Sequence, residues 1–199
     1  PSSNESDIPS AQSPNEEALI TSDDIINVVR NMWQGDAQWG SEPLGNSTNT
    51  ISRGGCLLTD LTIATNSLNK TSYTPKQINI FLRNANAFDG DLLKTPQAAT
   101  AINLRTEAVV RGSLSSMKDA VNIALQNGGM AILHVDFKGD AKGDHFILIH
   151  SRKNGIYEAS DPSYGISVGI MANLNGDTSS AKANVKLYKP SSVTPIYKA

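Results

Sequence analysis

The stretch "RGGCLLTD", residues 53–60, contains the only cysteine of the chain and marks a change of sequence pattern. Residues 34–55 before it are polar and rich in glycine, which is typical of a loop. From Cys56 onward, apolar residues recur every three or four positions, and this spacing predicts a buried helix. The apolar positions are Leu57, Leu58, Leu61, Ala64 and Leu68. Cys56 therefore opens a helix directly after a Gly-Gly turn.

Two more helices are predicted downstream. Thr74 is a suitable N-cap with Pro75 at the first helical position, and the inward side chains of that helix are expected to be Ile78, Phe81 and Leu82. A further helix is predicted from about Ser116 to the Gly-Gly pair at 128–129. Helical spacing also predicts a helix near Ile25, ahead of the loop.

After residue 129 the apolar pattern has a period of two, which indicates strands. Strands are predicted at 130–137, 145–150 and 155–159, and 185–188 is a further candidate. Asn154-Gly155 is the preferred pair for a tight hairpin turn, so the second and third strands should pair antiparallel. Helices followed by an antiparallel sheet predict an α+β domain.

Composition limits the classes of function. The net charge is -2 and no Lys/Arg block occurs, so a nucleic-acid partner is not expected. No apolar run approaches the roughly 20 residues that span a bilayer, so a membrane partner is not expected either. Residues 1–20 are rich in Ser, Pro, Asn and Glu, which predicts a flexible tail or linker before a folded domain at 21–199. Such a linker suggests a module of a larger multidomain chain.

Cys56 is placed to act as a nucleophile. Unpaired N–H groups and the helix dipole at a helix N-terminus favour a thiolate, which is the reactive form of cysteine. The glycines before it leave room for a substrate and an oxyanion pocket. The competing interpretation is a small packing residue, because cysteine is among the residues most often buried.

A cysteine nucleophile needs a base, usually histidine, held by a third polar group. Of the three histidines, His145 opens a strand beside a loop, whereas His134 and His150 are better suited to structural roles. Asp161 follows the strand that pairs with the His145 strand. Because the hairpin is antiparallel, His145 and Asp161 should lie together at its open end.

Three blocks in this order resemble papain-like cysteine peptidases of the bacteriocin-processing (double-glycine) type, in particular their bacterial and phage branch. The blocks are Gln34–Trp39 with Leu44-Gly45, Ile51 and Gly55–Thr59; Thr74–Asn79 with Phe88–Leu93; and Gly143–Phe146 with Ser160–Gly165. The resemblance implies a papain-like fold, with Cys56 as nucleophile, His145 as general base and acid, Asp161 as its orienting group and Gln34 as oxyanion donor. It implies neither a metal nor an organic cofactor.

Two residues depart from that family's pattern. Asp60 places a carboxylate one helical turn beyond the thiol, where it would disfavour the thiolate if it faced the site. Asp144 stands directly before His145, where glycine is frequent. Trp33 and Trp39 flank the loop leading to Cys56 and are expected mainly to pin it, with Trp39 and Asp144 as candidate residues of a substrate groove.

These patterns together predict an amide-bond hydrolase that acts through a thioester on a peptide or protein, including the stem peptides of peptidoglycan. A secreted or otherwise extracytoplasmic location is expected for such a module. Two alternatives stay open at this point. One is a toxin-like glutamine deamidase or transglutaminase with the same triad, and the other is a non-catalytic peptide-binding domain.

Overall fold

The computed structural model describes residues 32–136, 143–153, 156–165, 170–171, 179–180 and 189–199. Four of the sequence-based predictions lie outside these residues. They are the tail at 1–20, the helix near Ile25, the tight turn at 154–155 and the candidate strand at 185–188.

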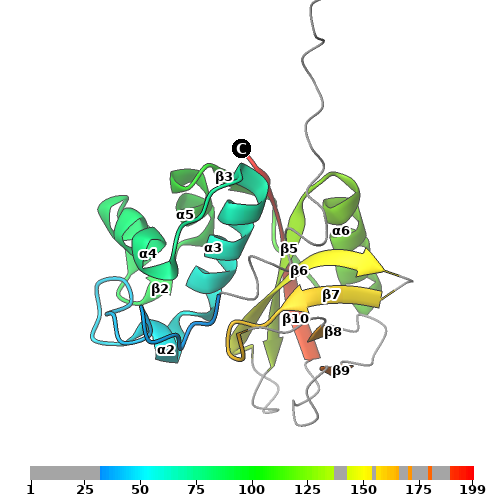
Figure 1. Ribbon diagram of the computed structural model, residues 1–199. Helices are drawn as coiled ribbons and strands as arrows, with labels where there is room; N and C mark the ends of the chain where they lie inside the picture. The colour runs from blue at the N-terminus through cyan, green and yellow to red at the C-terminus, as the bar shows by residue number, and fades with distance from the viewer. Residues whose placement is uncertain (1–31, 137–142, 154–155, 166–169, 172–178, 181–188) are drawn as a thin grey trace, which may run out of the picture.

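The described chain is an α+β structure in two parts, as the sequence predicts (Figure 1). Four helices gather in one part, and an antiparallel sheet with one further helix forms the other. The first part contains α2 (Ile51–Gly54), α3 (Cys56–Asn69), α4 (Pro75–Asn84) and α5 (Thr95–Ala101), and the sheet part contains α6 (Leu114–Gln126). A small hairpin of β1 (Phe88–Asp89) and β2 (Leu92–Leu93) belongs to the helical part.

All the strand pairs of the main sheet are antiparallel among the described residues, and their order is β3-β10-β5-β6-β7-β8-β9, with β4 also on β10. The strands are β3 (Leu104–Thr106), β4 (Val110–Arg111), β5 (Met130–Asp136), β6 (His145–Lys153), β7 (Ile156–Ser160), β8 (Ile170–Met171), β9 (Ser179–Ser180) and β10 (Lys189–Lys198). The predicted pairing of β6 with β7 is confirmed.

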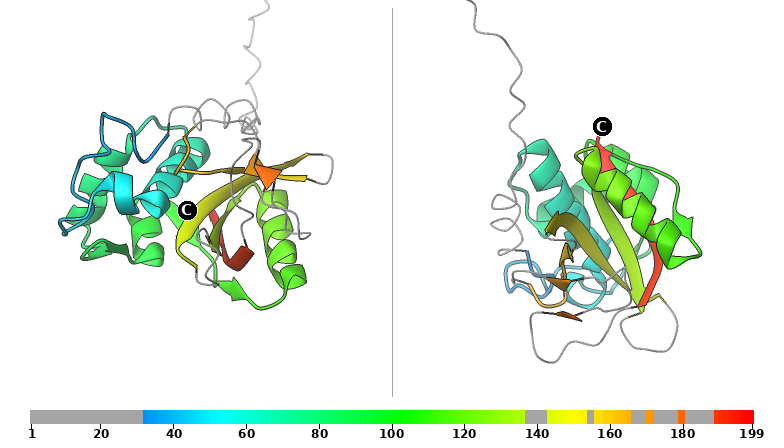
Figure 2. Two further views of the ribbon diagram at one scale, coloured as in Figure 1. Left: turned by 90° about the horizontal axis from the view of Figure 1, so that it is seen from below. Right: turned by 90° about the vertical axis from the view of Figure 1, so that its right-hand side faces the viewer.

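The two faces of the sheet carry separate cores. Successive side chains of a strand point to opposite faces, and β6 follows this rule in its centre. Leu148 packs in a cluster with residues of α3, whereas Ile147 and Ile149 pack in a second cluster with residues of α6. Figure 2 shows α3 and α6 on opposite sides of the sheet. The sheet is therefore buried on both faces, and α3 lies against the face that carries Leu148.

Helix α3 is buried along nearly its whole length, although it contains several polar residues. The hydroxyls of Thr59, Thr62 and Thr65 each donate to the carbonyl four residues earlier, so their burial leaves no unpaired donor. Gly55 allows the tight entry, because a Cβ there would come 2.5 Å from the carbonyl oxygen of Ile51. A larger residue at 55 would push Cys56 away from its place.

The helix boundaries agree with the sequence in one case and differ in another. Thr74 is the N-cap of α4 and Pro75 its first residue, as predicted, and Gln77 completes a capping box with Thr74. Helix α6 begins at Leu114 and not near Ser116, because the Ser113 side chain accepts a hydrogen bond from the Ser116 amide and is the true N-cap.

One predicted core residue of α4 is at the surface. Ile78 and Leu82 are fully buried, but Phe81 is 48% exposed. Its ring instead packs edge-on against Tyr73, with centroids 5.5 Å apart. The prediction for Phe81 is wrong because its position lies at the margin of the apolar stripe, where a neighbouring aromatic ring covers it only in part.

Strand β10 was not predicted from the sequence, although it lies between β3 and β5. It contains Pro190 and Pro195, and proline is normally confined to edges and bulges of a sheet. A β-bulge between Pro190 and Ser192 shifts the register there. Pro195 has no backbone N–H to donate, but its carbonyl still accepts a hydrogen bond from the Glu107 amide at 3.1 Å. Pro195 therefore removes only one hydrogen-bond donor from the strand pairing.

Candidate active site

Three candidate residues come from three separate elements. Cys56 is the first residue of α3, His145 is the first residue of β6, and Asp161 follows directly on β7. The pairing of Leu148 with Ser160 brings the start of β6 beside the end of β7. Because α3 packs on this sheet, its N-terminus completes the cluster.

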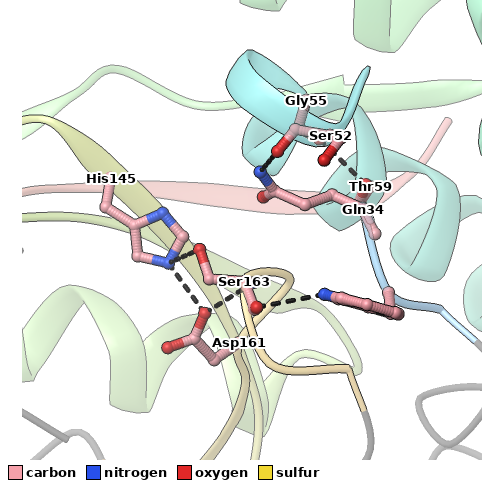
Figure 3. Close-up of polar contacts among 8 residues, drawn as sticks. Gln34, Ser52, Gly55, Thr59, His145, Asp161 and Ser163 are labelled. Atoms are coloured by element: carbon pink, nitrogen blue, oxygen red, sulfur yellow. Dashed lines mark hydrogen bonds and ion pairs between the residues drawn. The ribbon is translucent and has the colours of Figure 1, made fainter. Parts of the chain in front are cut away.

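His145 and Asp161 form a buried hydrogen-bonded pair. Nε2 of His145 lies 2.8 Å from Oδ1 of Asp161, and the two side chains are 5% and 0% exposed. The same Oδ1 accepts the backbone N–H of Ser163 at 2.9 Å. Figure 3 shows this arrangement, with the Ser163 hydroxyl 3.4 Å from Nε2. With Asp161 ionised, Nε2–H donates to it and Nδ1 is left to exchange a proton elsewhere.

The Cys56 thiol is half-buried, forms no disulfide and interacts with the His145 imidazole. Burial by itself lowers the pKa of His145. Hydrogen bonds to Asp161 and Cys56, together with their negative charges, outweigh burial and raise that pKa to about 10. The arrangement therefore favours the protonated imidazolium form of His145 beside Asp161 and Cys56.

Asp60 faces these charges from one helical turn beyond Cys56. It is fully buried, and neither carboxyl oxygen has a hydrogen-bond partner among the described residues. Burial raises the pKa of Asp60 well above its usual value. The charges of Cys56 and Asp161 raise it further, and that of His145 opposes them. The neutral acid is thus favoured, and in that form Asp60 does not repel a thiolate.

Gln34 lies beside the entry to α3. Its side chain is buried, and Nε2 donates to the carbonyl of Ser52 at 2.7 Å. An amide NH₂ carries two protons, and this bond uses one. Oε1 is buried and has no partner within the described part of the chain. Figure 3 shows the Gln34 amide next to the turn that carries Ser52 and Gly55.

The two tryptophans, both expected mainly to pin the loop, lie in different surroundings. Trp39 is only 3% exposed and belongs to the core of the helical part, so its assignment to a substrate groove is wrong. Its Nε1 donates to the carbonyl of Trp33 at 2.7 Å. Trp33 is 44% exposed, and its Nε1 donates to the carbonyl of Ser163 at 3.1 Å. Trp33 is therefore the tryptophan beside the site.

Asp144, the other groove candidate, is exposed. Burial lowers the pKa of His134. This lowering is opposed by a hydrogen bond to the Gly143 backbone and by the charge of Asp144. The His134 ring also stacks on Phe146, with centroids 4.3 Å apart. His150 is buried inside β6, where burial lowers its pKa to about 4 against the opposing charge of Glu158. It is therefore neutral at pH 7.

Two contributors to the site were missed from the sequence. Ser163 and Trp33 hold the turn that carries Asp161, through the contacts given above. The Asp-Pro-Ser order was the available signal for Ser163, since an Asp side chain in a turn commonly accepts the amide two residues on. For Trp33 no local signal exists, because its partner is 130 residues away.

Comparison with known proteins leaves the site to be judged on its own geometry. No family model matches the chain, and a search of curated proteins found no significant match. Within the described ranges, no helix combines the length and the apolar character needed to cross a membrane.

Proposed function

We propose that the protein is a cysteine-dependent hydrolase of amide bonds with a papain-like fold. The observation that carries the proposal is the buried imidazole of His145, whose Nε2 lies 2.8 Å from Asp161 and which also interacts with the thiol of Cys56. Acyl transfer through a thioester requires a nucleophile, a base that contacts it and a group that orients the base. The thiol opens α3, where backbone N–H groups favour negative charge.

In the first half of the reaction, the Cys56 thiolate attacks the carbonyl carbon of the substrate. The carbonyl oxygen gains the negative charge and is bound by the backbone N–H of Cys56 and by the second amide proton of Gln34. When the C–N bond breaks, the imidazolium of His145 gives its proton to the leaving amine. A thioester between Cys56 and the acyl group remains.

In the second half, neutral His145 takes a proton from a water molecule as the oxygen attacks the thioester carbonyl. The C–S bond then breaks, which releases a carboxylic acid and restores the thiolate and the imidazolium. Asp161 keeps Nε2 protonated throughout, so that only the other ring nitrogen exchanges a proton. Neutral Asp60 leaves this charge balance undisturbed.

Peptide bonds of proteins and of peptidoglycan stem peptides are the substrate classes that we propose. The test is mass spectrometry of products from unfolded protein and from purified muropeptides, with the full chain and its Cys56→Ala variant. Shortened products from the full chain alone support the hydrolase. A mass gain equal to exchange of NH₂ for OH, without chain cleavage, identifies a glutamine deamidase instead. Identical products from both proteins, or none, contradict the nucleophile.

A further inference from the structure

We propose that Trp33 is a positioning residue of the active site: it holds the turn formed by residues 161–165 and thereby keeps Asp161 on His145. This inference rests on the proposed function, because it concerns the same three residues. In this proposal Trp33 acts through the 161–165 turn and not on the reacting atoms themselves.

The first step is the contact between Trp33 and that turn. The indole Nε1 donates to the carbonyl of Ser163 at 3.1 Å. The next residue, Gln34, donates its backbone N–H to the carbonyl of Pro162 at 3.0 Å. Gly165 has a φ of +48°, and a Cβ there would come 2.1 Å from the Cβ of Trp33. Two consecutive residues thus bind two consecutive carbonyls, and a glycine lets the turn close on the tryptophan.

The second step runs from the turn to the imidazole. Oδ1 of Asp161 accepts the Ser163 backbone N–H at 2.9 Å and is the same oxygen that lies 2.8 Å from Nε2 of His145. Figure 3 shows the contacts among Ser163, Asp161 and His145, and the hydrogen bond from the Trp33 indole to the Ser163 carbonyl extends this series of contacts. A shift of Ser163 therefore moves the oxygen on which the imidazole depends.

Trp33 is also anchored to the helical part of the molecule. Its carbonyl accepts the Nε1 proton of Trp39, which is buried in the core of the helical part. The Gln34 side chain bonds the carbonyl of Ser52 in α2, four residues before Cys56. Residues 33 and 34 therefore connect the side of the site that carries the thiol to the side that carries Asp161.

Trp33 is 44% exposed, so a positioning role must be distinguished from two simpler ones. The indole could be a contact for the substrate, or it could stabilise the fold without affecting catalysis. A substrate contact changes KM, and a purely structural role changes stability but not kcat of the folded enzyme. A positioning role lowers kcat through Asp161, and that dependence can be measured directly.

The experiment compares Trp33→Phe with the full chain, with Phe81→Leu as a matched control. Phenylalanine keeps an aromatic ring but removes the hydrogen bond to Ser163. Phe81 is also an exposed aromatic residue at 48%, and its ring contacts that of Tyr73, away from the site. We expect Trp33→Phe to lower kcat on the order of tenfold with KM unchanged, since loss of a hydrogen bond of ordinary strength corresponds to such a factor. Phe81→Leu should leave kcat unchanged.

The same substitution is then made in an Asp161→Asn background, where the positioning role predicts no further loss of kcat. An equal loss in that background, a change confined to KM, or no change at all would overturn the inference. Gly165→Ala is the independent second variant, and it should reproduce the kcat loss because its Cβ displaces the turn from Trp33.

A readout that needs no activity separates this inference from the proposed function. In the Cys56→Ala protein, Trp33→Phe should speed hydrogen exchange at the Ser163 and Tyr164 amides, which bond Asp161. Exchange within α6 should stay the same. Unchanged exchange at both turn amides contradicts the inference even if the enzyme is a hydrolase. If exchange at these amides is faster but the full chain hydrolyses nothing, the positioning role of Trp33 is supported and the proposed function is contradicted.

Discussion

Asp161→Asn tests the buried pair at the centre of the site. The asparagine keeps the shape of the side chain but removes the charge that balances the His145 imidazolium. Both side chains are nearly inaccessible, at 5% and 0% exposure, so water cannot replace the lost charge. Breaking a buried pair by removing one partner costs about 3–5 kcal/mol, and we expect a loss of unfolding free energy of that order at pH 6.

The loss should depend on pH in a definite direction. His145 has its pKa raised from 6.5 to about 10 in the folded protein. A group whose pKa is raised by folding contributes its full stability below its unfolded pKa, and this contribution disappears as the pH rises through the folded pKa. The difference between the two pKa values corresponds to about 5 kcal/mol at roughly 1.4 kcal/mol per unit. The stability difference between the full chain and Asp161→Asn should therefore shrink from pH 6.5 to pH 10.

The assay is urea unfolding at a series of pH values, followed by tryptophan fluorescence. Lys76→Gln is the control, because the Lys76–Glu42 pair is exposed and pairs of that kind contribute less than about 1 kcal/mol. A loss for Asp161→Asn no larger than that of the control at pH 6 would refute the reasoning. So would a stability difference that stays constant or grows up to pH 10.

Asp60→Asn should become more stable than the full chain as the pH rises above the ordinary Asp pKa of 3.8. The reason is that buried Asp60 has a raised pKa, so the folded state keeps a proton that the unfolded chain loses. Urea unfolding at pH 4 and pH 8 measures the difference in unfolding free energy between the two proteins, and the same difference at both pH values would contradict this prediction. Thr74→Ala should cost about 1 kcal/mol of unfolding free energy, since it removes the hydroxyl oxygen that accepts the Gln77 backbone N–H in the capping box at α4. Thermal unfolding measures that loss, and no change in melting temperature would contradict the capping role.

The elements with regular patterns could be predicted from the sequence. The spacing of apolar residues after Cys56 indicated α3, and Thr74-Pro75 indicated the start of α4. The pairing of His145 with Asp161 followed from hairpin geometry alone, because an antiparallel pair of strands brings the start of one beside the end of the other. Local pattern and short-range connection were sufficient in these cases.

The remaining features depend on contacts between distant segments. Two prolines in β10 kept it from being recognised as a strand in the sequence. In the structure it pairs with β3 on one side and with β5 on the other. The burial of Asp60 depends on how α3 packs against the sheet. Trp33 and Trp39 are chemically identical in the sequence, and only the fold distinguishes the one in the core from the one beside Ser163.

The most direct test of the central claim is the rate at which iodoacetamide modifies Cys56 at pH 6. The chain has a single cysteine, so intact-mass spectrometry reports that site alone. An ordinary thiol with a pKa near 8.5 is under about 1% thiolate at pH 6, and the thiolate is the form that reacts. We predict that the full chain reacts on the order of tenfold faster than both His145→Ala and a peptide of residues 53–60. Equal rates for all three would contradict a thiolate held by His145 and, with it, the proposed nucleophile.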